Sequence, residues 1–519
     1  MPNKSSAKVM VFDIGTQSTR ALIFDISGNL LWKTQTKSSV YIAETDFVAE
    51  KSCDAYWEEM CAVSQELKTL AGDEWKNIVA VSVTSIRNSL MFLDEYCNQT
   101  RDAILWLDKR EVQCKKKLPL LNSILFTLVG MSESCRVIRK TSSTNWVREN
   151  QPDIWAKTAK IVMPSAYFNF RLTGELKDST ASQAAKIPYD YKHKRWQTKH
   201  SLNYPIFGVE IEKMCDLVNP GDKIGSITQA AANDTGLPVG IAVIATGADK
   251  MCETLGSGSA KENLASISLG TAASVEITTK KYVEPENFMP AYTSLMPNMY
   301  SPEIQIFRGY WMISWYKNEF AKIFQNRAEE ENKKVEILLD EMLREAPVGC
   351  NGLILQPYWG PGLKTPEAKG CVIGFTDAVT KEVFYRAIVE GIGYGLLDGL
   401  DNLKMRAKRE ITALSLSGGG SQSDIVCQIM ADIFGLPMYR VQTYETSGLG
   451  SAMVSFVGVG VFENIPQAVE NMCHKTDEFI PNMENHEIYS RYYKIYKKIY
   501  KCVKPLYDEL YKTLGEDKK

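Results

Sequence analysis

Residues 8–25, KVMVFDIGTQSTRALIFD, decide the fold of this chain. The run Lys8–Phe12 is short and apolar, which is typical of a buried strand. Asp13–Gln17 then reads as a turn, and Thr19–Phe24 reads as a second strand. A glycine between two strands lets backbone N–H groups approach an anion, and the hydroxyls beside Gly15 add donors. We therefore predict a β-hairpin whose turn suits a phosphate group. A plain hairpin capped by an aspartate is the alternative.

Further strands and one long helix are expected around this hairpin. Leu30–Thr34 and Ile78–Thr84 read as strands, and the apolar stripe over Cys53–Ala71 predicts an amphipathic helix. Pro238–Ala245 reads as the last strand of this half and leads to Asp249. Together these elements predict an α+β domain.

The same pattern restarts at residues 264–278, where a predicted strand, a Gly-Thr turn and another strand follow one another. The strings Asp-Ile-Gly-Thr (13–16) and Ser-Leu-Gly-Thr (268–271) can be superposed. Because they stand where two equal halves would begin, we predict an α/β chain with a duplicated domain, divided into 1–252 and 253–519.

Composition excludes several classes of protein. The chain has 519 residues, with 60 basic against 62 acidic side chains, so it has no electrostatic footprint for nucleic acid or an anionic membrane. No apolar run reaches the ~20 residues of a membrane span, and no signal peptide opens the chain. The twelve cysteines and four histidines show no metal-ligand spacing. We expect a cytoplasmic protein that binds neither nucleic acid nor membrane.

A run of three glycines is the third informative motif. Gly418–Gly420 follows a predicted strand, Ala413–Leu416, and precedes a predicted helix, Asp424–Phe434. Glycines at such a junction permit close backbone approach to a flat or anionic ligand, and a flexible loop is the alternative. No Walker sequence and no G-x-G-x-x-G follows the strands, which argues against a P-loop or Rossmann protein. Asp13, at a strand end, suits a Mg²⁺ ion held through water.

In this order the motifs resemble the FGGY carbohydrate kinases of the actin-like and sugar-kinase superfamily. The resemblance covers nearly the whole chain and implies two duplicated actin-like (ribonuclease H-like) domains with a cleft between them. The matching segments are 13–20 (first phosphate loop), 103–110, 172–174, 247–249 (catalytic aspartate), 268–271 (second phosphate loop), 370–391 (C-terminal signature) and 418–423 (adenosine loop).

The resemblance implies ATP-dependent phosphorylation of a hydroxyl group on a sugar, polyol or sugar acid, with Mg²⁺ as the metal. Asp249 would be the general base, and Asp13 would hold Mg²⁺ through water. The residues that bind ATP and its phosphates would be Gly15, Thr16, Gln17, Ser18, Arg20, Gly270, Thr271, Gly419, Gly420 and Gln422. The substrate would contact Arg87, Asn88, Trp106 and Asp249. The chain could also form a homodimer.

Two departures from the family pattern bear on the substrate. Ser143 stands where a lysine is usual, three residues before Trp146. Residues 84–89 resemble the Asn-Gln-Arg-Glu string of glycerol kinases, but with Asn88 in place of glutamate, and they lack the Gln-Met-His string of xylulose kinases. Glycerol and D-xylulose are therefore disfavoured. Asn88 and Lys250 together would favour an acidic sugar, unless Lys250 faces solvent and Arg87 binds a neutral hydroxyl.

Three other functions are kept as alternatives: a kinase of a non-sugar alcohol, a chaperone or filament ATPase, and an inactive paralogue that senses sugar or nucleotide. Arg87, Trp106 and Arg110 argue against the second, and the presence of both Asp13 and Asp249 argues against the third. Asp249 also has a purely structural interpretation, as the N-cap of a helix that begins at residue 250.

Overall fold

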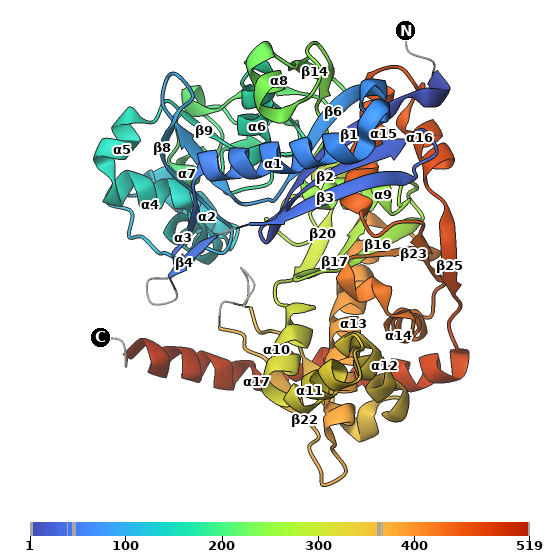
Figure 1. Ribbon diagram of the computed structural model, residues 1–519. Coiled ribbons are helices and arrows are strands. Elements are labelled where there is room, and N and C mark those ends of the chain that lie inside the picture. The colour runs from blue at the N-terminus through green and yellow to red at the C-terminus, as the bar shows by residue number, and fades with distance from the viewer. Residues whose placement is uncertain (1–3, 39, 44–47, 361–364, 366, 517–519) are drawn as a thin grey trace. The chain divides into compact units, whose positions relative to one another are not determined.

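The computed structural model describes residues 4–38, 40–43, 48–360, 365 and 367–516 (Figure 1). The chain divides into two compact units. Unit 1 consists of Met1–Ala260, Pro290–Ser301 and Glu445–His474, and unit 2 consists of Lys261–Met289, Pro302–Tyr444 and Lys475–Lys519. Two short segments from the second half of the chain thus belong to unit 1, a feature that the expected ranges 1–252 and 253–519 do not describe.

The centre of unit 1 is a six-stranded sheet in the order β14-β15-β6-β1-β2-β3. Its strands are β1 (Lys8–Ile14), β2 (Ser18–Asp25), β3 (Leu30–Lys37), β6 (Ile78–Ser85), β14 (Lys223–Ser226) and β15 (Ala242–Ile244). The predicted hairpin is present, because β1 and β2 pair antiparallel, with Asp13 opposite Arg20. β1 is parallel to β6, which is parallel to β15. The strand expected over 238–245 is shorter than predicted.

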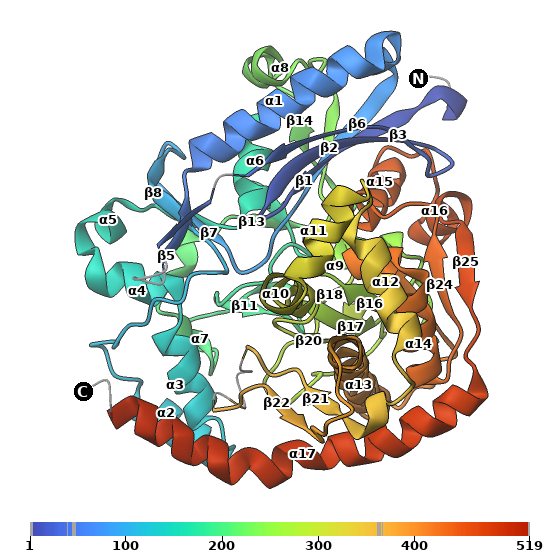
Figure 2. The ribbon, with the colours of Figure 1, turned by 60° about the horizontal axis from the view of Figure 1, so that its bottom comes forward.

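Helices cover both faces of this sheet, which explains why β1 is buried along its whole length (Figures 1 and 2). Met10 and Phe12 belong to the core cluster that includes α1 (Cys53–Ala71), whose bounds are those expected from the sequence. Val9 and Val11 point the other way and pack with residues of α15 (Thr446–Gly458). The two-residue period of a strand therefore divides its side chains between two cores.

The rest of unit 1 extends from a second, five-stranded sheet in the order β4-β5-β8-β7-β9. Its strands are β4 (Tyr41–Ala43), β5 (Val48–Lys51), β7 (Leu90–Leu93), β8 (Gln99–Ile104) and β9 (Lys160–Val162). The helices of this region are α2 (Leu120–Leu128), α3 (Ser132–Lys140), α4 (Ser143–Asn150), α5 (Pro152–Lys157), α6 (Pro164–Thr173), α7 (Tyr204–Phe207) and α8 (Gln229–Thr235). After β15, the helix α9 (Asp249–Gly256) begins at Asp249, one residue before the start expected from the sequence.

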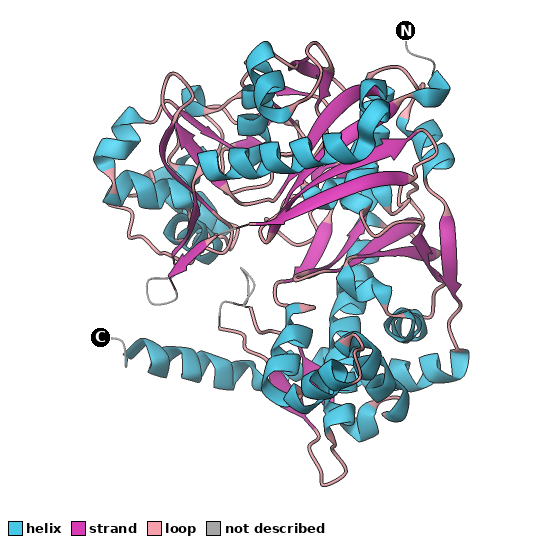
Figure 3. Cartoon of the chain, in the orientation of Figure 1, coloured by secondary structure: helices cyan, strands magenta, loops and turns pink. Residues whose placement is uncertain are grey.

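Unit 2 contains a six-stranded sheet of its own with the order β20-β17-β16-β23-β24-β25. Strands are drawn in magenta in Figure 3. Its strands are β16 (Leu264–Leu269), β17 (Ala273–Ile277), β20 (Glu303–Ile306), β23 (Ala413–Ser417), β24 (Met438–Val441) and β25 (Lys475–Phe479). Read from β25, the pairings are antiparallel, parallel, parallel, antiparallel and antiparallel, the same series as in unit 1 read from β14. The predicted α/β fold with a duplicated domain is confirmed.

Helices of unit 2 pack around this sheet and are locked by a buried ionic cluster. They are α10 (Trp311–Phe320), α11 (Lys322–Glu330), α12 (Val335–Glu345), α13 (Lys381–Ala407), α14 (Asp424–Phe434) and α17 (Met483–Glu516). Arg386 on α13 donates to Glu390 (2.8 Å) and to the hydroxyl of Tyr489 on α17 (2.8 Å). The C-terminal signature segment therefore serves packing at these positions. No helix among the described residues is long and apolar enough to cross a membrane.

Candidate active site

The turn of the first hairpin is closed tightly and is held by a neighbouring indole. The Gly15 N–H donates to the Ser18 carbonyl (3.0 Å), and a Cβ atom on Gly15 would lie only 2.8 Å from that oxygen. The indole Nε1 of Trp106 donates to the Thr16 hydroxyl (2.8 Å). Because an indole is a donor only, the Thr16 proton stays available for another acceptor. Ser18 is buried and Gln17 is exposed, while Thr16 is half-buried beside the Trp106 indole.

Asp13 lies at the end of β1 and shares a guanidinium with a residue from the distant C-terminal segment. Arg20 Nη1 lies 3.1 Å from Asp13 Oδ2 and 3.5 Å from Glu445 Oε2. Burial raises the pKa of Asp13 to about 6; the charge of Arg20 opposes this rise, and those of Glu445 and Asp249 add to it. Asp13 and Asp249, at the ends of β1 and after β15, are thus close enough to interact electrostatically.

The carboxylates of Asp13 and Asp249 would suit a Mg²⁺ ion that takes its other ligands from water and phosphate. They do not resemble a metal site built from protein side chains alone. Among the residues that the structure describes, no group of three or more His, Cys, Asp or Glu side chains could hold a metal. Mg²⁺ commonly uses only one or two protein carboxylates, because waters and substrate phosphates complete its octahedron. Asp13, mostly buried and near the carboxylate of Asp249, meets that requirement.

Asp249 is the first residue of α9, and its carboxylate remains 30% exposed. The N-cap of the helix is Ala248, so the interpretation of Asp249 as the N-cap is wrong. Its Oδ1 accepts from the Lys250 backbone N–H (2.8 Å) and lies 3.7 Å from Arg87 Nε. Burial raises the pKa of Asp249 above its usual range, against the charges of Arg87 and Lys250. A carboxylate that is oriented, accessible and raised in pKa is suited to accept a proton.

Arg87 and Asn88 follow the end of β6, where the chain turns sharply. The Arg87 guanidinium lies over the ring of Tyr292, 5.2 Å from its centroid. Asn88 has a φ of 53° and donates its backbone N–H to Ala184 (2.8 Å). Asparagine tolerates this left-handed conformation better than glutamate does, so the turn itself accounts for the replacement noted in the sequence. Arg87 is therefore the side chain that links this turn to Asp249.

Lys250, the other residue behind the acidic-sugar hypothesis, is an ion-pair partner. Its ammonium lies 2.5 Å from the Glu253 carboxylate, one turn along α9. The two side chains are only 17% and 9% exposed. Glu253 therefore partly balances the positive charge counted from the sequence, although the charge of Lys250 still opposes the rise in the pKa of Asp249.

The two predicted nucleotide loops of unit 2 are adjacent. Gly270 and Thr271 form the turn between β16 and β17, and their carbonyls accept from the backbone N–H groups of Tyr310 and Trp311 (3.2 Å each). A Cβ atom on Gly418 would lie 2.7 Å from the Leu269 backbone, so the glycine loop lies directly on the end of β16. The sequence-predicted phosphate and adenosine loops thus meet within one unit.

The glycine loop contacts two supporting residues, the half-buried Tyr310 and the buried Arg440. A Cβ atom on Gly420 would come within 2.4 Å of the Tyr310 ring, while Gly419 faces open space. Arg440 on β24 donates to the Ser421 carbonyl (2.9 Å). Gln422, at the end of the loop, is exposed. Gly419 and Gln422 are consequently the accessible members of the loop.

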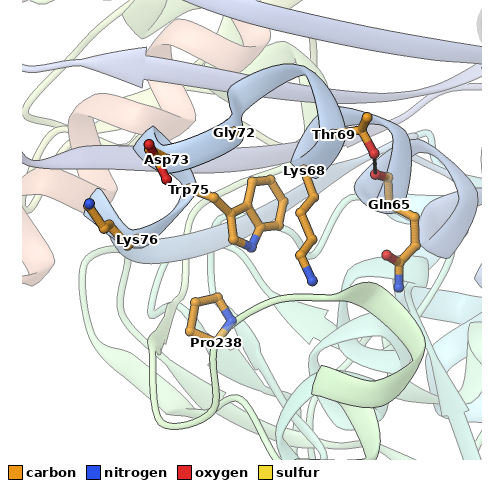
Figure 4. A pocket seen from close by; sticks show the side chains of 8 residues that line it. All are labelled: Gln65, Lys68, Thr69, Gly72, Asp73, Trp75, Lys76 and Pro238. Atoms are coloured by element: carbon orange, nitrogen blue, oxygen red, sulfur yellow. Dashed lines mark hydrogen bonds between the residues drawn. The ribbon is translucent and has the colours of Figure 1, made fainter.

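A hollow of about 670 Å³ is found elsewhere in unit 1 (Figure 4). It is lined by Gln65, Lys68, Thr69, Gly72, Asp73, Trp75, Lys76 and Pro238. Residues 72–77 directly precede β6, whose first residue, Ile78, pairs with Lys8 at the start of β1. Asp13 lies near the other end of β1, so the hollow is at the opposite edge of the sheet and contains none of the site residues.

Comparisons with known proteins agree with this geometry. The model of the N-terminal domain of the FGGY family of carbohydrate kinases matches residues 8–256, and that of the C-terminal domain matches residues 265–459. The chain belongs to the FGGY family of carbohydrate kinases. It is therefore a phosphotransferase that uses ATP and a sugar-class substrate.

Individual relatives cover this kinase almost end to end. The uncharacterized sugar kinase YgcE of Escherichia coli K12 is 28% identical over 487 residues, covering 93% of this chain and 91% of its own. A xylulose kinase of Lactococcus lactis IL1403 is 27% identical over 497 residues, covering 94% and 95%. The crystal structure of the xylulose kinase from Rhodospirillum rubrum has a TM-score of 0.81 at 21% identity, covering 96% and 100%, which supports the fold.

Sequence reasoning missed three residues of the site: Tyr292, Tyr310 and Glu445. None belongs to a motif, and two lie in the short segments that join unit 1 from the second half of the chain. The small residues that follow Glu445 are the sequence feature that could have indicated its place near the hairpin. A Cβ atom on Gly448 would lie 2.4 Å from the Leu22 side chain, so this helix needs glycine to approach β2.

Proposed function

We propose that this kinase transfers the γ-phosphoryl group of ATP to a hydroxyl of a neutral sugar or polyol, with Asp249 as general base. The observation that carries the proposal is the grouping of Asp249, Arg87 and Tyr292. A partly exposed carboxylate lies 3.7 Å from a guanidinium that itself covers an aromatic ring. A hydroxyl bound beside Arg87 can give its proton to Asp249 as it attacks the phosphoryl group.

The first hairpin turn would hold the transferred phosphate. Thr16 can donate its hydroxyl proton, because Trp106 already occupies one of its lone pairs. Trp106 also links this turn to the substrate side, since its backbone N–H donates to Ser89 (3.2 Å). Asp13 would hold Mg²⁺, which supplies charge neutralisation on the phosphates. These residues orient the reactants, which is the main demand of phosphoryl transfer.

Unit 2 would supply the nucleotide contacts. Gly270 and Thr271 would meet the phosphates, and Gly419, Gly420 and Gln422 would meet the adenosine. Support comes from the direct packing of the glycine loop on the end of β16, next to Gly270. A nucleotide has its phosphates and its base a short distance apart, so adjacent loops suit it.

A neutral substrate is favoured over a sugar acid. The hypothesis of an acidic sugar required one extra positive charge, and the Glu253 carboxylate lies 2.5 Å from that charge. Arg87 is likewise close to Asp249, which leaves little net positive potential for a second carboxylate. The neutral reading of the sequence is therefore the one we propose.

The test combines a substrate panel with one substitution. ADP release is measured with matched pairs of polyols, ketoses and aldonates in the wild type and in Asp249→Asn. We expect a neutral compound to give the highest kcat/KM, and Asp249→Asn to lower kcat by at least about 10²-fold. ADP affinity, measured by calorimetry, should stay nearly unchanged.

Lys250→Gln is the matched control for charge beside the base. It should leave the order of substrates unaltered, because Glu253 already partly balances the charge of Lys250. Near-normal turnover in Asp249→Asn would refute the general base. A clear preference for the aldonate that disappears in Lys250→Gln would restore the acidic substrate.

A further inference from the structure

Arg20 is placed between two carboxylates that come from opposite ends of the chain. Its Nη1 lies 3.1 Å from Asp13 on the neighbouring strand and 3.5 Å from Glu445. Its Nε donates to the side-chain oxygen of Gln35 (3.3 Å), which holds the guanidinium plane on the far side. Lys33 pairs with the other oxygen of Glu445. Arg20 thus contacts two carboxylates. Of these, Glu445 is not predicted to bind metal, and it also pairs with Lys33.

The fold fixes Glu445 in this position. It directly precedes α15, which packs against β2 and α9 within unit 1. A Cβ atom on Gly448 would overlap Leu22, and one on Gly450 would lie 2.0 Å from the Cys252 carbonyl. Two glycines in the first turns of α15 therefore bring the start of the helix close to Arg20.

Arg20 and a divalent cation would compete for the same partner. Asp13 has a side chain only 9% exposed, and Arg20 is its cation in this structure. A buried carboxylate needs a counter-charge, and a bound metal ion would supply it in place of the guanidinium. Arg20, at 33% exposure, then needs another carboxylate. Glu445 is already within 3.5 Å of the same nitrogen, so a rotation of the guanidinium suffices.

We propose that Glu445 is a positioning residue that takes Arg20 over from Asp13, and so makes Asp13 available to the divalent cation. The inference rests on the proposed metal role of Asp13. It predicts that Glu445 affects metal binding only through Arg20. This separates it from a general electrostatic effect, in which any nearby negative charge would attract a cation whether Arg20 is present or not.

The experiment measures binding of Mn²⁺ alone to the full chain, from the electron paramagnetic resonance signal of free Mn²⁺. We expect Glu445→Gln to weaken Mn²⁺ binding about fivefold, the size of one partly exposed ion pair. Arg20→Gln should strengthen binding by a similar factor, because Asp13 then lacks its competitor. The double variant should bind Mn²⁺ as Arg20→Gln does, with no further loss from Glu445→Gln.

The controls distinguish the two proposals. Glu74→Gln makes the same substitution in an ion pair with Lys8, at the opposite edge of the same sheet, and should leave Mn²⁺ binding unchanged. Asp13→Asn should abolish binding; if it does not, the proposed metal role of Asp13 fails. If it does, but Glu445→Gln weakens Mn²⁺ binding as much in the Arg20→Gln background as in the wild type, the role of Glu445 is refuted. Absence of Mn²⁺ binding by Arg20→Gln would refute it as well.

Discussion

The two sheets share one strand order, and their first hairpins differ in charge at the pair of residues that starts with the position before Ile14 or Leu269. In unit 1, Asp13 stands opposite Arg20 across β1 and β2. At the corresponding place in unit 2, Ser268 stands opposite Ser274 across β16 and β17. The turns that follow are the same Gly-Thr pair. Both copies therefore share the antiparallel hairpin, while an ion pair stands at this position in unit 1 alone among the described residues.

If both Gly-Thr turns bind phosphates, as we propose, the hairpin is a shared phosphate-binding frame and the Asp13–Arg20 pair specialises one copy of it. Ser268 and Ser274 are both buried and uncharged, so this pair adds no charge beside the Gly-Thr turn of unit 2. A neutral turn suits phosphates whose charge is already balanced, whereas a carboxylate beside the turn suits the metal that balances it. The predictions below test whether one copy can be turned into the other.

The largest effect is expected when the unit 1 hairpin is made to resemble that of unit 2. Asp13→Ser removes the carboxylate that we assign to Mg²⁺ and should lower metal-dependent kcat by on the order of 10²-fold. Sugar affinity, measured by calorimetry without nucleotide, should be unaffected, because Arg87 and Asp249 are unaltered. If sugar affinity fell as much as kcat, Asp13 would be a residue of the substrate pocket. The difference between the two hairpins would then not concern the metal.

A smaller effect is expected from a substitution in the glycine loop of unit 2. We predict no corresponding loop in unit 1. In Gly420→Ala, the new Cβ would overlap the ring of the half-buried Tyr310, and the backbone N–H of Tyr310 donates to the Gly270 carbonyl. Overpacking of this kind costs about 1–3 kcal/mol, and we expect ADP affinity to fall about tenfold and the melting temperature to drop.

Gly419→Ala is the matched control, because its Cβ would meet no atom within 4 Å. It should leave the melting temperature unchanged. A loss of ADP affinity in Gly419→Ala would then come from contact with the nucleotide itself. Unchanged ADP affinity in both variants would show that the nucleotide does not bind at this loop.

Much of this comparison could be predicted from the sequence, because short-range patterns determine it. The helix bounds of α1 and α14 and the strand bounds of β16 follow from apolar periodicity and agree with the structure. The loops that follow strand ends were found from glycine and hydroxyl residues in fixed order. Such features depend on neighbours in the chain, which the sequence displays directly.

The remainder depends on which distant segments meet. Glu445 is about 430 residues from Asp13 in the chain, and no local pattern connects them. Tyr292 reaches Arg87 because residues 290–301 belong to unit 1, although they lie beyond the start of unit 2 in the chain. The pairing of Lys250 with Glu253 was visible as a three-residue helical spacing, but the direction of both side chains required the structure.

The units also differ in how they bury positive charge, and this gives the smallest effect. Arg386 of unit 2 has a carboxylate partner, Glu390, at 2.8 Å. Lys186 of unit 1 donates to the Thr141 carbonyl (3.1 Å) and hydroxyl (2.6 Å), and among the described residues no carboxylate pairs with it. Burial lowers the pKa of Lys186 to about 8. Lys186 lies two residues from Ala184, which bonds to the Asn88 turn beside Arg87.

We therefore expect Lys186→Met to raise the melting temperature at pH 7. In the folded state the pKa of Lys186 is about 8, below the usual value near 10.5, so the charged amine is disfavoured by folding. This cost is fully present below pH 8, shrinks as the pH rises toward 10.5 and vanishes above it. The stabilisation should be a few degrees, at about 2–4 °C per kcal/mol, and should be smaller at pH 9.5.

Lys223→Met is the control. Because Lys223 is at an exposed position of β14, this variant should leave the melting temperature unchanged at both pH values. A destabilised Lys186→Met would mean that its bonds to Thr141 outweigh the buried charge. If instead the variant is more stable but has a lower kcat/KM for sugar, the charge is kept in unit 1 for the substrate at a cost to stability.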